Sequence, residues 1–462
     1  MNIKNLFLNE TKKQLDEIGP GMCLAKWTQT TLHLGVGHTH SCHHPKTHVI
    51  PISEIKKNPS ALHNTSAKKL ARQEMMTGSR PAECHYCWNI EDSAPAGAEV
   101  YSDRVYKSND SWSKPYFNKV KEVGYTGDIN PAYLEVSFNY ACNFKCAYCS
   151  PEISSKWMEE IKQYGAYPTS RQFNNINHVI AQDKMPIAER DENPYVDAFW
   201  EWWPDLYPTL HTFRITGGEP LMTKHTFRVL DYIIEHPNKD LELAINTNCV
   251  VEDKLFDKFI EKLKIIESQR LVKSVTVYTS CEAFGARAEY IRHGMDYDKW
   301  FFNCCRLLRE VPTLHFAIMS TYNALSVTSY KEFLQDVLIL KRNYRKPGRE
   351  ITIDIPYLDH PKFMNIGILP KSFKPMIEEQ IDYMKSNQIG LFRRVGFKET
   401  EIAKLERIQY LFQDTPEVIN QKDFYMFFTE HDKRRATDFL ATFPEMADFY
   451  AYCRSLFTLD NK

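Results

Sequence analysis

The strongest constraint on the fold is a regular alternation of strand-like and helix-like segments between residues 130 and 360. Amphipathic helical patterns, as in residues 224–236 and 252–266, separate short apolar runs. A strand that returns to the same sheet through a helix does so in parallel, with a right-handed crossover. The repeat therefore predicts an α/β fold with a parallel sheet and outer helices. Six runs read as strands: residues 132–138, 211–217, 241–248, 273–280, 313–320 and 350–357.

Six strands are too few for the closed eight-stranded barrel that such repeats often form. We therefore expect residues 130–360 to form a partial (β/α)6 TIM-like barrel. Residues 164–205 interrupt it after the first strand as an aromatic-rich insertion. The amphipathic segments of residues 365–462 predict helices that cap the open barrel. The insertion's tryptophans are expected either to form part of a lid or to pack in the core: Trp200, Trp202 and Trp203.

Composition and hydropathy exclude two classes of partner. Lys and Arg number 58 against 59 Asp and Glu, so no net field would concentrate the protein on long nucleic acid. No stretch approaches the roughly 20 apolar residues that a membrane span needs. The first residues lack the basic and apolar regions of a signal peptide. We therefore expect a cytoplasmic protein without a membrane partner.

Three cysteines follow the first predicted strand in the spacing C-x3-C-x2-C: Cys142, Cys146 and Cys149. Disulfides are disfavoured in a reducing compartment, so clustered thiols there more often bind metal. Soft thiolates select iron–sulfur clusters, zinc or copper(I). Three thiolates on one loop can hold three irons of a cubane and leave the fourth iron without a protein ligand. A zinc loop is the alternative.

The motif CNFKCAYC, with a strand before it, resembles the cluster loop of the radical S-adenosylmethionine (SAM) superfamily. The turn TGGEP at residues 216–220 follows the second predicted strand, where family members carry a Gly-Gly-Glu-Pro turn. Asn248 in the segment NTNC resembles the Asn of the family's Thr-Asn-Gly turn, with Cys249 in place of the Gly. Ser280 and Arg292 have a spacing like that of the family's Ser and Arg.

The resemblance implies a 4Fe-4S cluster on Cys142, Cys146 and Cys149, whose open iron chelates the amino and carboxylate groups of SAM. An Arg can bind a carboxylate through two parallel hydrogen bonds. The other matched residues are implied SAM contacts: Tyr148 near the adenine, Gly217, Gly218 and Glu219 at the ammonium, Asn248 in the third turn, and Ser280 and Arg292 at the methionine carboxylate.

A second set of cysteines lies in residues 1–110, which we expect to form a loop-rich N-terminal metal-binding module. Four thiolates close a metal site completely, which suits a structural or electron-transfer centre. The set resembles the auxiliary-cluster twitch domain of some radical SAM proteins. Structural zinc and unbound thiols are the alternatives, and zinc could also use His38, His40, His43 or His44. The four cysteines are Cys23, Cys42, Cys84 and Cys87.

The resemblance also implies the activity. An electron from a cellular reductant such as flavodoxin or ferredoxin would cleave SAM to a 5'-deoxyadenosyl radical, which abstracts hydrogen from a substrate over the strand ends. Relatives with auxiliary clusters often modify peptides or proteins, which makes such a substrate the first expectation. The alternatives are radical modification of a nucleotide or small metabolite, and a non-catalytic iron–sulfur or zinc-stapled scaffold.

Overall fold

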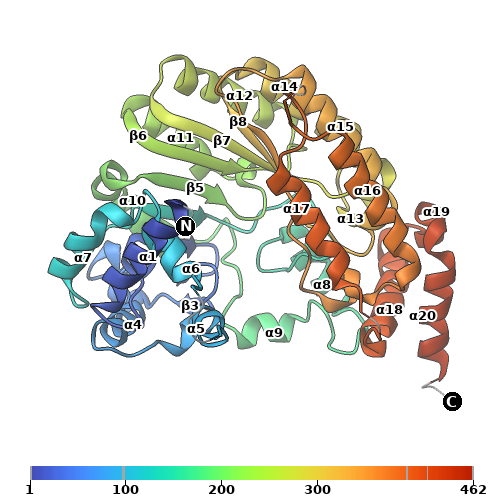
Figure 1. Ribbon diagram of the computed structural model, residues 1–462, viewed down its shortest axis with the longest axis horizontal. Coiled ribbons are helices and arrows are strands. Elements are labelled where there is room, and N and C mark those ends of the chain that lie inside the picture. Colours follow the sequence, from blue (N-terminus) through green and yellow to red (C-terminus); the bar gives the residue numbers. More distant parts are fainter. Residues whose placement is uncertain (1–2, 96–98, 392–393, 414, 460–462) are drawn as a thin grey trace.

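The computed structural model describes residues 3–95, 99–391, 394–413 and 415–459, and within them nine strands form one sheet (Figure 1). The order is β3-β2-β1-β4-β5-β6-β7-β8-β9. From β4 onward each strand is parallel to its neighbours. The mixed α/β class is thus confirmed, and closure into a partial barrel stays a prediction. These strands are β4 (Tyr133–Ser137), β5 (Thr212–Thr216), β6 (Asn238–Asn246), β7 (Val272–Ser280), β8 (His315–Met319) and β9 (Ile351–Asp354).

Helices follow these strands and bury one face of the sheet. In Figure 1 α12, α14 and α15 lie along the outer rim of the upper half of the molecule. Strand residues alternate between faces, so in β5 Phe213 and Ile215 are buried whereas Arg214 and Thr216 are partly exposed. The face of β5 that points away from these helices is therefore polar. The helices are α11 (Lys224–Glu235), α12 (Asp253–Ser268), α14 (Tyr297–Glu310) and α15 (Tyr330–Asn343).

Residues 1–110 are more regular than the sequence indicates, so the loop-rich expectation is wrong there. β1 (Gln29–His33) runs parallel to β4, with Thr31 opposite Glu135. The sequence of this strand does not alternate between apolar and polar residues. Its Gln and Thr side chains are nevertheless buried. The N-terminal segment thus extends the sheet. Its other elements are β2 (His38–His40), β3 (His48–Val49), α1 (Ile3–Asp16), α2 (Ala25–Thr28), α3 (Ile52–Ile55), α4 (Ser66–Met76), α5 (His85–Asp92) and α6 (Asp103–Asn109), and α7 (Phe117–Val123) follows.

The insertion after β4 contains α9 (Ile176–Ala181) and α10 (Pro194–Leu206), and the tryptophans of α10 pack in the core. Trp203 is 1% exposed, and its ring centroid lies 5.0 Å from that of Phe213 in β5. Trp202 is also buried, and Trp200 stacks on Phe138 just after β4. Of the two expectations for these side chains, core packing is confirmed and the lid is wrong.

The chain after residue 365 is mainly helical and reaches back to the loop that follows β4. In α18 (Val418–Arg435), Nη1 of Arg435 donates to the carbonyl oxygen of Lys145 at 2.8 Å. Among the described residues, no helix combines the length and apolar character needed to cross a membrane. The remaining helices are α8 (Ser155–Tyr164), α13 (Gly285–Ile291), α16 (Lys374–Ser386), α17 (Glu399–Ile408), α19 (Phe439–Thr442) and α20 (Ala447–Leu459).

Candidate functional site

The loop between β4 and α8 carries Cys142, Cys146 and Cys149, and hydrogen bonds fix its backbone at each of them. The amide of Cys142 donates to Oγ of Ser155 at 3.1 Å. Nε1 of the buried Trp157 donates to the carbonyl oxygen of Cys146 at 2.7 Å. The amide of Cys149 donates to the same carbonyl oxygen at 2.9 Å. The first turn of α8 thus anchors the thiol loop at the carboxyl end of β4.

The three thiols lie near one another in surroundings that disfavour a free thiolate. Burial, and next the neighbouring Cys146 thiol, raise the pKa of Cys142 above its ordinary range. The same two causes raise the pKa of Cys149 to about 12. Free thiols here stay protonated at neutral pH, so a bound cation is needed to hold them as thiolates. A set of three neighbouring soft donors fits an iron–sulfur cluster.

The glycine turn after β5 packs directly on the start of the thiol loop. The amide of Glu219 donates to the carbonyl oxygen of Ala141 at 2.7 Å. A Cβ on Gly218 would lie 2.4 Å from the same oxygen, which leaves no room for a side chain. Gly217 has φ +130°, which disfavours any other residue. Both glycines are therefore required for the turn to meet the thiol loop.

The Glu219 side chain links this turn to the turn after β6. Its carboxylate is 1% exposed and accepts hydrogen bonds from Oγ1 of Thr247 at 2.8 Å and from the amide of Asn248 at 2.6 Å. Burial raises the pKa of Glu219 to about 7. Nδ2 of Asn248 donates to Oδ1 of Asn143 in the thiol loop at 2.7 Å. Three loops at the strand ends thus form one hydrogen-bonded unit.

Gly218→Ala is expected to lower the iron content of the thiol loop severalfold, because the new methyl group must push the loop away from the turn. The measurement is iron per chain after anaerobic reconstitution. Gly390→Ala is the matched control, since a Cβ there meets no atom within 4 Å. Equal iron in the two variants would contradict the close contact between turn and loop.

Arg292 follows α13 and lies against the thiol loop. Its Nη1 is 3.8 Å from Sγ of Cys146, and its Nη2 donates to the hydroxyl of Tyr148 at 2.6 Å. Nε also donates to the buried Glu282 at 2.8 Å. The structure therefore brings Arg292 and Tyr148, two of the expected SAM contacts, to the cysteines. Ser280 ends β7, opposite Met319 of β8.

Comparisons with known proteins support the family that this loop resembles. No protein-family model matches the chain. The GTP 3',8-cyclase of Aliarcobacter butzleri is 28% identical over 132 residues, 29% of this chain and 30% of the cyclase. That of Campylobacter lari is 28% identical over 116 residues, 25% of this chain and 27% of the cyclase. The chain thus matches less than a third of the length of these two cyclases, which are radical SAM enzymes. Over these segments the chain is therefore similar to radical SAM enzymes.

Two solved structures show a distant likeness to this chain. Streptococcus suis SuiB bound to precursor peptide SuiA has a TM-score of 0.36 and 12% identity, over 81% of this chain and 71% of that chain. SuiB bound to S-adenosylmethionine has a TM-score of 0.35 and 14% identity, over 79% of this chain and 70% of that chain.

The four N-terminal cysteines line one cavity, with Trp88 and Arg104 in its wall. Burial raises the pKa of Cys23 to about 11 and that of Cys84 to about 12. The buried Lys26 lies beside them: although burial lowers its pKa, the Cys84 thiol and Glu83 raise it overall. A buried ammonium next to thiols favours their thiolate form. Within the described ranges, no three His, Cys, Asp or Glu side chains gather around a single-ion position.

The histidines near these cysteines have mostly other partners. Nε2 of His38 lies 2.9 Å from the carbonyl oxygen of Asp183, and Nε2 of His40 lies 3.1 Å from Nε2 of His33. His44 does line the thiol cavity, where its Nε2 pairs with Oδ2 of Asp103 at 2.7 Å. Of the four histidines considered as zinc ligands, His44 is thus the one that the structure places at the cavity wall.

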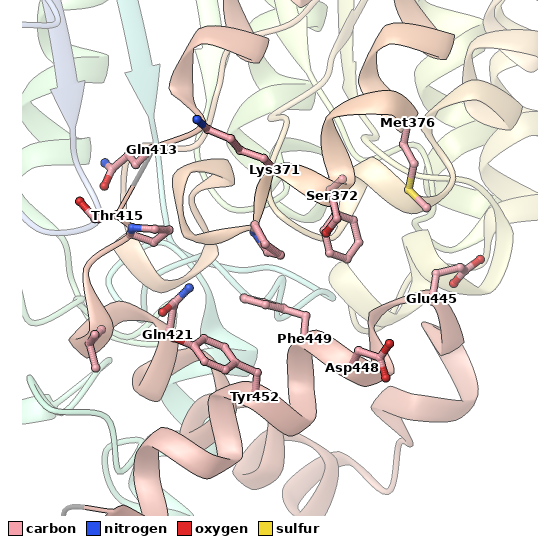
Figure 2. Close-up of a pocket in the computed structure, with 14 residues that line it drawn as sticks. Lys371, Ser372, Met376, Gln413, Thr415, Gln421, Glu445, Asp448, Phe449 and Tyr452 are labelled. Atoms are coloured by element: carbon pink, nitrogen blue, oxygen red, sulfur yellow. The ribbon is translucent and has the colours of Figure 1, made fainter.

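Two larger cavities differ in their relation to the thiol loop. The cavity in Figure 2, of about 910 Å³, is lined by residues between 370 and 452 in the C-terminal helices, and none of its lining residues is a cysteine. Another, of about 740 Å³, begins at Tyr148 and Cys149 and is walled by the insertion. Its wall is tied to the thiol loop, because Nδ2 of Asn174 donates to the carbonyl oxygen of Cys149 at 2.9 Å. This second cavity adjoins the candidate site.

Two residues at the site were missed by sequence reasoning. Glu282 bonds both Arg292 and Tyr148, and Asn143 bonds Asn248. The position of Glu282, two residues beyond the end of β7, was the available signal, since polar side chains past strand ends converge in parallel sheets. Asn143 lies inside the cysteine motif itself.

Proposed function

We propose that this protein cleaves SAM reductively and uses the resulting 5'-deoxyadenosyl radical to abstract hydrogen from a substrate. The observation that carries the proposal is the contact between the three-cysteine loop and the glycine turn at the carboxyl ends of β4 and β5. A 4Fe-4S cluster on Cys142, Cys146 and Cys149 supplies the electron to the sulfonium when it is bound. Glu219 and Asn248 keep the surrounding turns in register.

A peptide or protein is the proposed substrate, and the cavity beside Cys149 supports it. That cavity contains several amide side chains, which both donate and accept hydrogen bonds as a peptide backbone does. Its formal charges balance, with three cationic and three carboxylate side chains: Arg171, Lys184, Lys362, Glu152, Glu417 and Asp423. A polyphosphate ligand would favour an excess of cations. The second candidate, a nucleotide, rests on the similarity to GTP 3',8-cyclases.

The test is anaerobic incubation of the reconstituted protein with dithionite and SAM, with 5'-deoxyadenosine as the measured product. We expect its formation, and a further increase when a mixed-sequence peptide library is added but not when GTP is added. Stimulation by GTP alone would favour the nucleotide. Absence of 5'-deoxyadenosine from protein that contains the cluster would contradict the activity and favour the scaffold.

The four N-terminal cysteines belong to the same proposal as ligands of an auxiliary iron–sulfur cluster, in a twitch-type unit of residues 1–110. Residues 130–360 are the proposed radical SAM barrel and residues 365–462 its helical cap. The shared cavity of the four thiols and the neighbouring Lys26 ammonium support a tetrathiolate centre. A flavodoxin or ferredoxin is the proposed reductant.

Cys84→Ser is expected to lower the iron content from about eight to about four per chain, because one of two four-iron sites loses a ligand. Iron and zinc analysis beside EPR spectroscopy is the measurement, and the SAM-sensitive EPR signal is expected to persist. Cys305→Ser, at a partly buried position of α14, is the control. Loss of about one zinc with iron unchanged would establish structural zinc instead.

A further inference from the structure

Arg292 uses nearly all its hydrogen-bond donors within the protein. Nε and Nη2 donate to Oε2 of Glu282 at 2.8 and 2.6 Å, and Nη2 also donates to the hydroxyl of Tyr148 at 2.6 Å. Nη1 points to Sγ of Cys146 at 3.8 Å. A guanidinium has five N–H groups, so these four contacts leave a single one, on Nη1. The side chain is therefore committed to Glu282, Tyr148 and Cys146.

This commitment opposes the role that the family resemblance gives to Arg292. A two-point grip on the methionine carboxylate needs two adjacent N–H groups. Nε and one N–H of Nη2 are held by Glu282, so the pair would have to come from Nη1 and the other N–H of Nη2. That N–H of Nη2 is bonded to Tyr148, which a two-point grip would displace. The methionine carboxylate would therefore compete with the contacts that hold this guanidinium against the thiol loop.

The backbone also holds Arg292 in place beside Cys146. The amide of Lys145 donates to the carbonyl oxygen of His293 at 2.9 Å, and the amide of Ala147 donates to that of Ile291 at 2.7 Å. These two hydrogen bonds lie on either side of Cys146 in the thiol loop and on either side of Arg292 in the segment after α13. Arg292 itself is 6% exposed. Its position against the sulfur is thus fixed from the backbone and from the side chain.

We infer that Arg292, locked by Glu282 and Tyr148, donates a hydrogen bond to the Cys146 thiolate and so sets the reduction potential of the cluster on this loop. The inference rests on the proposed function, because that cluster is part of it. Hydrogen bonds to cluster sulfurs and nearby positive charge stabilise the more negative, reduced form. Arg292 therefore raises the potential, and Glu282 acts as a positioning residue through it.

The test compares wild-type protein with Arg292→Lys by an EPR-monitored redox titration of the SAM-sensitive cluster and by equilibrium binding of SAM. Lysine keeps the charge but loses the planar fork and the fixed N–H···S contact. We expect the one-electron reduction equilibrium to fall about tenfold, which corresponds to about 59 mV, with SAM affinity nearly unchanged. Arg287→Lys in α13 is the control, because Arg287 bonds Glu445 and Thr442 away from the thiols.

A double-mutant cycle tests the role of Glu282. In a Glu282→Gln background, Arg292→Lys is expected to change the potential much less than in wild type, because the guanidinium is no longer locked against Cys146. Should Arg292→Lys fail to assemble a cluster, Tyr148→Phe removes one of the locking contacts and is expected to lower the potential to a smaller extent.

An unchanged potential together with a severalfold loss of SAM affinity in Arg292→Lys would overturn the inference and return Arg292 to the methionine carboxylate. If Arg292→Lys shifted the reduction potential equally in wild-type protein and in Glu282→Gln, Glu282 would not act through Arg292. Failure of the proposed function looks different, because wild-type protein would then hold no SAM-sensitive cluster to titrate.

Discussion

Replacing Cys142, Cys146 and Cys149 together by Ala is expected to abolish 5'-deoxyadenosine formation by the reduced protein. The three thiols are neighbours on one loop, and their pKa values are raised by burial, so their thiolates form with the metal or not at all. Without them no iron is left to chelate SAM. The measurement is chromatographic detection of 5'-deoxyadenosine after anaerobic reduction with SAM present.

The same variant is expected to lose about four of about eight irons and the SAM-dependent change in the EPR spectrum. Cys305→Ala, in α14, is the control for removal of a thiol elsewhere. Product formation at the wild-type rate by the triple variant would exclude this loop as the site of cleavage. Loss of both clusters together would show that the N-terminal module depends on the thiol loop.

Glu160→Ala is expected to lower the free energy of unfolding by about 3–5 kcal/mol, the usual cost of removing one partner of a buried ion pair. Oε2 and Oε1 of Glu160 accept from Nε and Nη2 of the buried Arg435 at 3.1 and 3.2 Å. Glu160 also pairs with Lys145 of the thiol loop. The substitution strands a buried guanidinium, so urea unfolding at neutral pH should show the loss.

The pH dependence of this loss follows from the charge of Glu160. Burial raises its pKa, but Arg435, Lys145 and Tyr167 outweigh burial and lower the pKa to about 2. A lowered folded-state pKa gives stability that is complete above the ordinary value of 4.5 and disappears as pH falls toward about 2. The difference in unfolding free energy between wild type and Glu160→Ala should therefore shrink as pH falls across that window.

Glu159→Ala provides the control on the same helix, because the Glu159 side chain is 62% exposed and pairs with Lys156 at the surface. We expect a change within about 0.5 kcal/mol. A similar loss for both variants would mean that α8 tolerates neither substitution for reasons of helix formation. It would also mean that the Glu160–Arg435 ion pair does not anchor the C-terminal helices.

The sequence by itself determined the features that depend on short spacing along the chain. The alternation of strand-like and helix-like segments indicated parallel strands, because a strand that returns to its sheet through a helix does so in parallel. The C-x3-C-x2-C spacing predicted the thiol loop, and the glycine pair 217–218 predicted the turn that packs on it. Each is a local pattern, and the polypeptide geometry that it requires is local too.

Tertiary structure alone decided what depends on residues far apart in the chain. Glu160 meets Arg435 across 275 positions, and Arg292 meets Cys146 across 146. Neither pairing produces a periodic pattern in the sequence. A single buried charge can lie on any helix that reaches its partner, so its position in the chain does not reveal the pair. β1 was missed for a related reason: its buried threonines look polar until the sheet that covers them is known. Long-range burial, rather than local pattern, sets these contacts.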